Sequence, residues 1–300
     1  MYTIVGSGFG LYGYLPALAK GQDESVLLPR TYESKVRARP ELAGTLPSIH
    51  WVEDEVAALS LASAVVIATP PKRQFEVVSR CLTLTNIEKL VLEKPLAASP
   101  AYAVELISKL REAKKRYRIG YTLLYTAWHQ RLAWAKLSPS SAMLSINWTF
   151  MAHHFKRDLA TWKRAHEEGG GVLRFYGIHL VALLVHHGYD GVLSSVLDGE
   201  DSCEPECWRA VFTGCGLPDC SVYVDSRSST NRFEIVRHAV MQEEVMHGVA
   251  DPFENEVHEV GEDARVCVLK RLLDTFQLDD RPFELFYERV NMLWQKIESV

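Results

Sequence analysis

Short apolar runs and amphipathic helical segments alternate along the N-terminal part of the chain. The runs are rich in Val, Ile and Leu, which is typical of strands buried on both faces of a parallel sheet. The pattern predicts strands over 2–5, 25–28, 48–52, 63–69 and 87–93. It predicts helices between and after them, over 33–43, 55–62, 72–82 and 101–116. This alternation of strands and helices predicts an α/β fold with a doubly wound parallel sheet.

The pattern changes near residue 118. Longer segments with apolar residues at every second position follow, which is typical of an antiparallel sheet with one covered face; they lie at 142–151, 208–215 and 221–226. Two helical stretches end the sequence, at 263–276 and 281–298. We therefore expect two domains, an N-terminal one over 1–118 and an α+β C-terminal one over 119–300 with a mostly antiparallel sheet.

Composition and charge narrow the choice of partners. A chain of 300 residues with a net charge of −5 can form two domains and lacks the excess of cations that nucleic acid or an anionic membrane would require. No apolar run approaches the roughly 18–20 residues that cross a bilayer. The first strand starts at residue 2 and leaves no room for a signal peptide, and the six cysteines are expected to be reduced thiols. We expect a cytoplasmic protein.

A glycine cluster follows the first predicted strand, in the sequence VGSGFG at residues 5–10. Glycines at such a turn let the backbone approach a pyrophosphate, whose charge is met by the N–H groups and dipole of the next helix. Gly6, Gly8 and Gly10 are in place. Leu11 stands where the dinucleotide fingerprint has its third glycine, which mainly serves close packing of helix on strand. A plain chain-reversing turn is the alternative, but the order of strand, turn and helix favours dinucleotide binding.

The end of the second predicted strand indicates which dinucleotide is bound. NAD-specific folds place an acidic residue there to accept hydrogen bonds from the ribose 2′-hydroxyl. This chain has Pro29 at that position, followed by Arg30 and Thr31. A guanidinium and a hydroxyl suit a 2′-phosphate, so NADP is favoured, with NAD as the other possibility. The alternative for Arg30 is a solvated loop residue.

Three further stretches give the chain a family resemblance. IATPPKRQF follows the fourth strand and LEKPLA follows the fifth, while WKRAHEEGGGVLRFYGIH occupies residues 162–179. Together with the glycine turn, these stretches resemble the Gfo/Idh/MocA oxidoreductases, the family of glucose–fructose oxidoreductase and inositol dehydrogenase. The resemblance implies an N-terminal Rossmann domain and an open-faced sheet in the second domain. The free face of that sheet commonly makes subunit contacts, so we expect a homo-oligomer, a dimer or a tetramer.

The resemblance also implies roles for individual residues around the cofactor. Gly6, Gly8, Phe9 and Gly10 would surround the pyrophosphate. Thr69, Pro70 and Pro71 would pass beside the ribose and nicotinamide, with Gln74 where relatives often have histidine. Glu93 would touch the nicotinamide ribose, and Lys94 would reach the oxygen of the reacting carbon. We expect a cis bond between Lys94 and Pro95. A lysine there suits hydride transfer, which needs a group that handles the hydroxyl proton and holds developing negative charge.

The chain departs from the family pattern in its second domain. His179 is present, and the resemblance implies that it shares the acid–base chemistry with Lys94. Relatives carry an aspartate four residues earlier, where this chain has Phe175, and a second acid is replaced by Ala182. The usual relay of lysine, aspartate and histidine is therefore incomplete. Tyr176 is adjacent but is not a simple substitute, because consecutive helical residues point in different directions.

Two functions from different classes follow. The first is an oxidoreductase that transfers hydride between NADP and a hydroxyl or carbonyl of a small molecule, namely a sugar, a sugar derivative or a cyclitol. The second is a dinucleotide-binding sensor or regulator without turnover. Lys94 favours the first and Phe175 favours the second, and we prefer the enzyme.

Two other groups of residues have simpler interpretations. Cys203, Cys207, Cys215 and Cys220 lie close together, but their spacing fits no common zinc site, so we expect free thiols and no metal. His153 and His154 follow a strand and lie either at the mouth of a cleft or in an exposed loop.

Overall fold

The computed structural model describes residues 1–21, 25–136, 143–239, 242–256 and 261–300. Contacts between residues divide the chain into two compact units, each made of three chain segments. Unit 1 contains Met1–Ala97, Glu105–Tyr125 and Glu256–Phe283, and unit 2 contains Ala98–Val104, Thr126–Asn255 and Glu284–Val300. The contiguous division at residue 118 remains a prediction about which segments fold independently.

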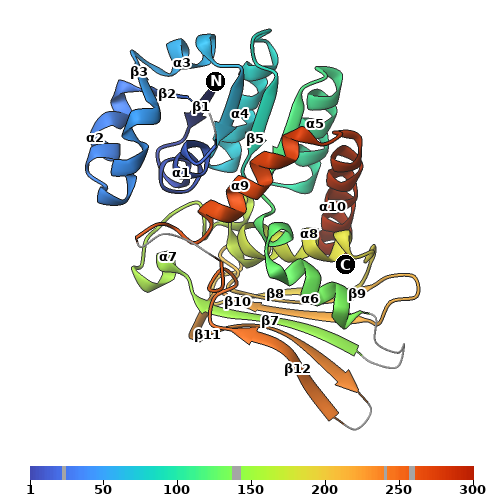
Figure 1. Cartoon of the computed structure of the whole chain (residues 1–300). Helices are drawn as coiled ribbons and strands as arrows, with labels where there is room; N and C mark the ends of the chain where they lie inside the picture. The colour runs from blue at the N-terminus through green and yellow to red at the C-terminus, as the bar shows by residue number, and fades with distance from the viewer. Residues whose placement is uncertain (22–24, 137–142, 240–241, 257–260) are drawn as a thin grey trace. The chain divides into compact units, whose positions relative to one another are not determined.

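Unit 1 contains a six-stranded parallel sheet of the Rossmann type (Figure 1). Its strand order is β3-β2-β1-β4-β5-β6, so the order reverses between β1 and β4. The strands are β1 (Tyr2–Val5), β2 (Val26–Pro29), β3 (Ile49–Val52), β4 (Ala64–Ile67), β5 (Lys89–Leu92) and β6 (Arg116–Ile119). β1, β2 and β4 are buried along their whole length. The predicted α/β fold and doubly wound sheet are confirmed.

The helices of unit 1 largely follow the predicted ones. They are η1 (Gly10–Tyr14), α1 (Leu15–Ala19), η2 (Arg30–Tyr32), α2 (Glu33–Arg37), η3 (Pro40–Ser48), α3 (Glu55–Leu61), α4 (Pro71–Leu82), η4 (Thr122–Tyr125), α9 (Val266–Asp274) and η7 (Thr275–Gln277). α5 (Pro100–Glu112) has residues in both units. The predicted continuous helix over 33–43 is wrong, because Pro40 cannot donate a backbone hydrogen bond and starts a new 3₁₀ segment. From much later in the chain, α9 packs against α1 and η1.

Unit 2 is built on a second six-stranded sheet with the order β12-β11-β7-β10-β9-β8. Its strands are β7 (Met143–Met151), β8 (Gly191–Asp198), β9 (Cys207–Thr213), β10 (Cys220–Asp225), β11 (Arg227–Ala239) and β12 (Gln242–Val249). Only β7 and β10 run parallel; the other neighbours are antiparallel, which confirms the mostly antiparallel sheet. Ala142, at the start of a predicted strand, lies outside the described residues. The sequence pattern did not indicate β8, β11 or β12.

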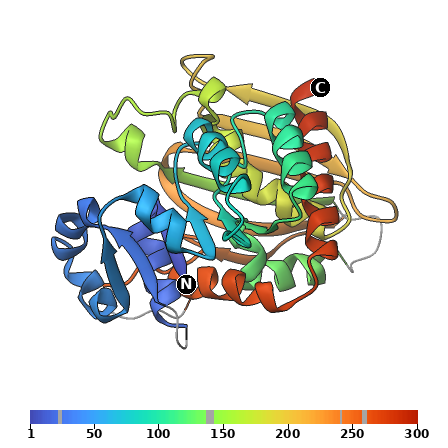
Figure 2. The same cartoon turned by 90° about the horizontal axis from the view of Figure 1, so that it is seen from above.

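One face of this second sheet is covered by helices. Figures 1 and 2 show α6 (Ala127–Ala135) and α8 (Ile178–His186) over the strands, and Figure 1 shows no described element over the opposite face. Leu144, Ile146 and Trp148 of β7 are buried, as the alternating pattern requires. The open face is largely polar: for example, Asn147 donates to Glu234 at 2.9 Å.

The remaining helices of unit 2 surround the glycine triplet. They are α7 (His153–Lys156), η5 (His166–Glu168), η6 (Val172–Gly177) and α10 (Arg281–Ser299), whose first residues belong to unit 1. Among the described residues, the one helical stretch with the length and apolarity of a membrane span is His166–His186. Its apolar window is 83% buried within the protein, and a core helix passes the same test.

Candidate functional site

The glycine turn at the end of β1 has the backbone that its sequence requires. Gly6 has a φ of +123°, and a Cβ there would lie 2.2 Å from the carbonyl oxygen of Ala68. A Cβ on Gly10 would lie 2.7 Å from Cγ2 of Ile4. Gly10 therefore provides the close approach of helix to strand, and Leu11 is free to be fully buried in the core.

The middle of the turn is open. No heavy atom outside the neighbouring residues lies within 4 Å of a Cβ built on Gly8, whose carbonyl accepts hydrogen bonds from the N–H groups of Leu11 and Tyr12. Open space beside a glycine at the start of a helix is what a pyrophosphate requires. The turn therefore fits a dinucleotide.

Two residues that follow β2 contact this turn, and the sequence alone did not identify them. The Tyr32 hydroxyl accepts a hydrogen bond from the Gly6 N–H at 3.1 Å. The Lys35 ammonium donates to the Ser7 hydroxyl at 2.7 Å. A cation at the turn adds to the positive potential that a phosphate group needs.

Arg30 and Thr31 lie in η2, directly after β2, and both are exposed. The Arg30 side chain is 67% exposed, and its nearest acid is Glu33 at 3.7 Å, which also pairs with Arg37 at 2.8 Å. The position is compatible with a 2′-phosphate contact, and equally with a solvated loop residue.

Thr69, Pro70 and Pro71 follow β4 at the same edge of the sheet. Pro71 is the first residue of α4, where a missing N–H costs nothing. The hydroxyl oxygen of Thr69 is buried and has no hydrogen-bond partner among the described residues. Because a buried polar atom without a partner is unfavourable, Thr69 fits a ligand that supplies one.

Gln74 holds the segment that follows β5. Its side-chain amide donates to the carbonyl oxygens of Glu93 at 2.8 Å and Leu96 at 3.0 Å, and it accepts from the Glu93 N–H at 2.9 Å. Gln74 is completely buried, so we expect it to position this segment behind the site rather than to touch the cofactor. The bond between Lys94 and Pro95 is cis, as predicted.

Glu93 lies in a closely fitted site. The Tyr14 hydroxyl, from η1, donates to Glu93 Oε1 at 2.6 Å, and a Cβ on Gly120 would lie 2.7 Å from the same oxygen. Burial raises the pKa of Glu93, although the Lys94 ammonium and the Tyr14 hydrogen bond oppose the change. Burial also raises the pKa of Tyr14 well above 10.0, and the charge of Glu93 adds to it. Tyr14 is thus a third residue, after Tyr32 and Lys35, that the sequence alone did not identify, and it stays protonated as a donor.

Phe9 occupies the gap between the glycine turn and α9. Its ring makes edge contacts with Tyr12 at 5.2 Å and Tyr14 at 5.5 Å between ring centroids. The Arg265 guanidinium lies 4.3 Å from its centroid and pairs with Asp263 at 2.7 Å. Phe9 therefore braces the turn through Tyr14 and α9.

The two predicted catalytic residues lie in different units. Lys94 is partly buried in unit 1, directly after β5 and Glu93. His179 is 6% exposed, in the first turn of α8 in unit 2. Phe175 lies in η6, a π-helical segment that leads into α8, and wide turns of this type are frequent at functional sites.

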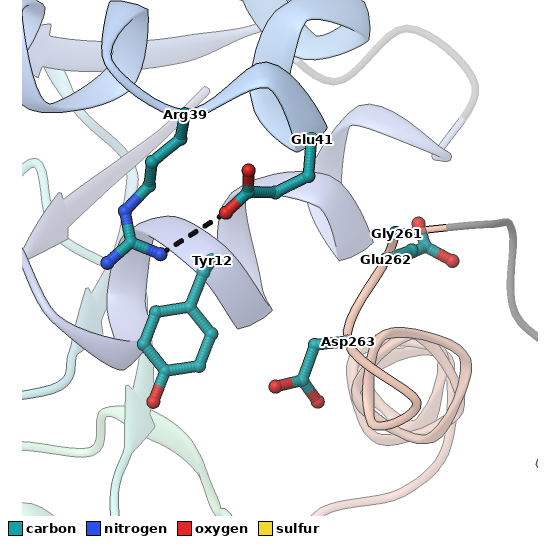
Figure 3. A pocket seen from close by; sticks show the side chains of 6 residues that line it. All are labelled: Tyr12, Arg39, Glu41, Gly261, Glu262 and Asp263. Carbon is teal, nitrogen blue, oxygen red and sulfur yellow. Dashed lines mark hydrogen bonds and ion pairs between the residues drawn. The ribbon is translucent and has the colours of Figure 1, made fainter.

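A small pocket lies beside the glycine turn in unit 1. Figure 3 shows Tyr12, Arg39 and Glu41 on one side and Gly261, Glu262 and Asp263 on the other. Its volume is about 240 Å³. Arg39 pairs with Glu41 at 3.4 Å and lies over the Tyr12 ring at 5.2 Å. Three carboxylates against one guanidinium do not suit a phosphate, so this pocket is not the dinucleotide site.

The sequence predicted free cysteine thiols and no metal site. Within the described residues, no three or more His, Cys, Asp or Glu side chains are grouped to hold a metal ion. All six cysteines are free thiols, and two of them, Cys81 and Cys220, are buried.

Comparison with known proteins agrees with this geometry. Residues 1–121 match the model of an oxidoreductase family with an NAD-binding Rossmann fold, Gfo/Idh/MocA. The match covers unit 1 up to Tyr121 and does not extend into the second sheet. The resemblance seen in the sequence is therefore confirmed, and with it the expectation of a nicotinamide dinucleotide. No curated protein matches the sequence.

Solved structures with the same fold span nearly the whole chain. The WlbA dehydrogenase from Chromobacterium violaceum, in complex with NADH and UDP-GlcNAcA, is 16% identical with a TM-score of 0.69 over 99% of this chain and 93% of that one. KijD10, a 3-ketoreductase from Actinomadura kijaniata in complex with NADP and TDP-benzene, is 14% identical with a TM-score of 0.70 over 99% and 96%. A super-repressor mutant of Gal80p from Saccharomyces cerevisiae is 13% identical with a TM-score of 0.68 over 100% and 93%. At these identities the likeness establishes the fold.

Proposed function

We propose that the protein is an oxidoreductase that transfers hydride between NADP and a hydroxyl or carbonyl group of a sugar-like small molecule. The observation that carries this proposal is the fixed segment Glu93–Lys94 after β5, close in the sheet order to the glycine turn after β1. In a doubly wound sheet, ligands bind at the carboxyl ends of the strands, near the reversal of strand order. That reversal lies between β1 and β4.

The cofactor would be held by three groups of residues. Gly6, Gly8, Phe9 and Gly10 would surround the pyrophosphate, while Thr69, Pro70 and Pro71 would lie beside the ribose and nicotinamide. Arg30, Thr31 and Lys35 would meet a 2′-phosphate, which favours NADP over NAD. When bound, the nicotinamide supplies the centre that accepts or donates hydride.

Lys94 and His179 would manage the proton of the substrate. The Lys94 ammonium would donate a hydrogen bond to the substrate oxygen and stabilise the negative charge that develops there. His179 would accept the hydroxyl proton when the substrate is oxidised and return it when the carbonyl is reduced. The Lys94 ammonium opposes the rise in the pKa of Glu93 that burial causes, since opposite charges close together attract each other.

The substrate class is supported by the proteins that share the fold. The WlbA structure contains UDP-GlcNAcA beside NADH, and the KijD10 structure contains TDP-benzene beside NADP. We infer a sugar, sugar derivative or cyclitol as substrate. A cytoplasmic homo-oligomer, a dimer or a tetramer, remains our expectation for the assembled protein.

A dinucleotide-binding regulator without turnover is the second candidate. Phe175 favours it, because a phenyl ring cannot bear the proton that the relatives' aspartate bears. One of the solved structures with the same fold is a super-repressor mutant of Gal80p.

A comparison of two lysine variants tests the proposal. Lys94→Ala should abolish turnover while leaving NADPH affinity nearly unchanged, since acid–base groups are typically worth about 10²–10⁴ in rate. Lys72→Ala, which removes an exposed lysine from α4, is the matched control and should behave as the wild type. NADPH oxidation is followed with a panel of keto sugars and sugar nucleotides. If wild type binds NADPH and turns over no member, with Lys94→Ala indistinguishable from it, the regulator is the better account.

A further inference from the structure

Partly exposed aromatic rings gather around Phe175 in unit 2. The Phe175 centroid lies 5.3 Å from that of Trp162 and 4.7 Å from that of Tyr176, both in edge-to-face geometry. Tyr176 lies 4.7 Å from Phe150 of β7. All four side chains are partly exposed. We call Trp162, Phe175 and Tyr176 the aromatic platform.

The platform is built by glycines and held rigidly. A Cβ on Gly170 would lie 2.1 Å from the carbonyl oxygen of Trp162, so only glycine lets the chain fold back against that residue. The Gly171 N–H donates to the Lys163 carbonyl at 2.8 Å and fixes the same loop. On η6, Arg174 forms a bidentate ion pair with Glu298 at 2.7 Å. The rings on either side of the glycine triplet are therefore preorganised.

Lys163 follows Trp162 in the chain and lies beside the platform. The Lys163 ammonium lies 5.3 Å from the Phe175 ring centroid. Arg164 is the next residue, and its guanidinium pairs with Glu204 and Asp158. His154 lies nearly parallel to Tyr176 at 6.2 Å; burial, with the charges of Lys163 and Arg164, lowers its pKa to about 4. The platform thus adjoins a cation, and the relatives' aspartate at this position would add a negative charge instead.

We propose that the aromatic platform with Lys163 binds a substrate ring that carries an anionic group. The flat apolar face of the ring would pack on Phe175 and Trp162, and the carboxylate or phosphate would meet the Lys163 ammonium. This inference rests on the proposed function and names the substrate class of the same site. Phe175 then recognises the substrate where the relatives' residue moves a proton.

Direct binding measurements on the full chain test this proposal. The probes are glucuronate, glucose as its neutral match, and UDP, each titrated by calorimetry in the presence of NADPH. We expect wild type to bind at least one anionic probe about tenfold more tightly than glucose, from one charge-assisted contact. Tighter binding of glucuronate assigns a carboxylated sugar, and tighter binding of UDP assigns a nucleotide group; both results support the platform.

Substitutions separate the ring from the charge. Phe175→Leu keeps an apolar side chain but removes the ring, and should weaken binding of the anionic probe about 3- to 10-fold. Phe175→Tyr should restore it, which controls for folding. Lys163→Gln should remove the preference over glucose and the dependence on salt, whereas Lys156→Gln, at the exposed last residue of α7, should not.

The outcomes distinguish this inference from the proposed function. Equal affinities for glucose and both anionic probes overturn the inference, as does unchanged affinity of an anionic probe in both Phe175→Leu and Lys163→Gln. NADPH binding and turnover are measured on the same samples. If NADPH does not bind but the anionic probe still binds more tightly than glucose, the proposed function is overturned and this inference stands.

Discussion

Tyr14→Phe removes a single hydroxyl and leaves the rest of the Glu93 site in place. That hydroxyl lies 2.6 Å from Glu93 Oε1, and the Tyr14 side chain is fully buried. A hydrogen bond to a charged group contributes about 1.5–3 kcal/mol, so the free energy of unfolding should fall by about that amount near neutral pH. NADPH affinity should fall as well, because Glu93 loses the donor that orients it.

The loss should depend on pH in a defined direction. Burial raises the pKa of Glu93 in the folded protein above the usual 4.5, so wild type loses stability as pH rises from there through the folded pKa. Without the Tyr14 donor, the folded pKa of Glu93 rises further and this loss grows. The difference between wild type and Tyr14→Phe should therefore be smallest below pH 4.5, where a neutral hydrogen bond is worth about 0.5–1.5 kcal/mol, and largest above the folded pKa of the variant.

Urea unfolding across a range of pH measures this difference. Tyr189→Phe is the matched control, because its buried hydroxyl donates to the neutral carbonyl of Pro218 at 2.9 Å. Its loss of stability should not change with pH. A pH-independent difference for Tyr14→Phe, equal to that of Tyr189→Phe, would refute the account of Glu93 as a buried carboxylate held by this donor.

Three further predictions concern the cofactor, the core and the assembly. Arg30→Ala should reduce the preference for NADPH over NADH by roughly one to two decades of affinity in calorimetry, and equal wild-type affinities would contradict the NADP assignment. Asp280→Asn should lower the free energy of unfolding by about 2–3 kcal/mol, because the fully buried Arg118 guanidinium loses the carboxylate that it contacts at 2.7 Å. A loss below about 1 kcal/mol in urea unfolding would contradict this. The edge strand β8 exposes Leu193 (61%) and Val196 (55%), so Leu193→Lys should shift a wild-type oligomer towards monomer in light scattering, and a monomeric wild type would contradict the predicted assembly.

The Rossmann sheet could be predicted because its signals are local. Buried strands appear as continuous apolar runs, and the glycine turn needs only residues adjacent in sequence. The sequence did not predict β11 because the strand is polar. Arg232 and Glu234 lie on its open face and pair with each other. The break at Pro40 was available from the sequence, because proline inside a helix removes a hydrogen bond.

Contacts between distant residues could not be predicted in the same way. Tyr14 and Glu93 are 79 positions apart and meet only through the order of strands in the sheet. Arg265 reaches Phe9 because α9 packs on η1 late in the chain. The roles of Lys94 and His179 came from a family resemblance rather than from spacing.

Transfer of isotope from cofactor to product tests the central claim most directly. The protein is incubated with NADPH that carries deuterium at the nicotinamide C4 position and with the panel of keto sugars and sugar nucleotides, and the products are examined by NMR. The account predicts deuterium at a carbinol carbon of one sugar product, formed by wild type and Lys72→Ala but not by Lys94→Ala. Tight binding of NADPH with no deuterium in any product would contradict hydride transfer as the function of this site.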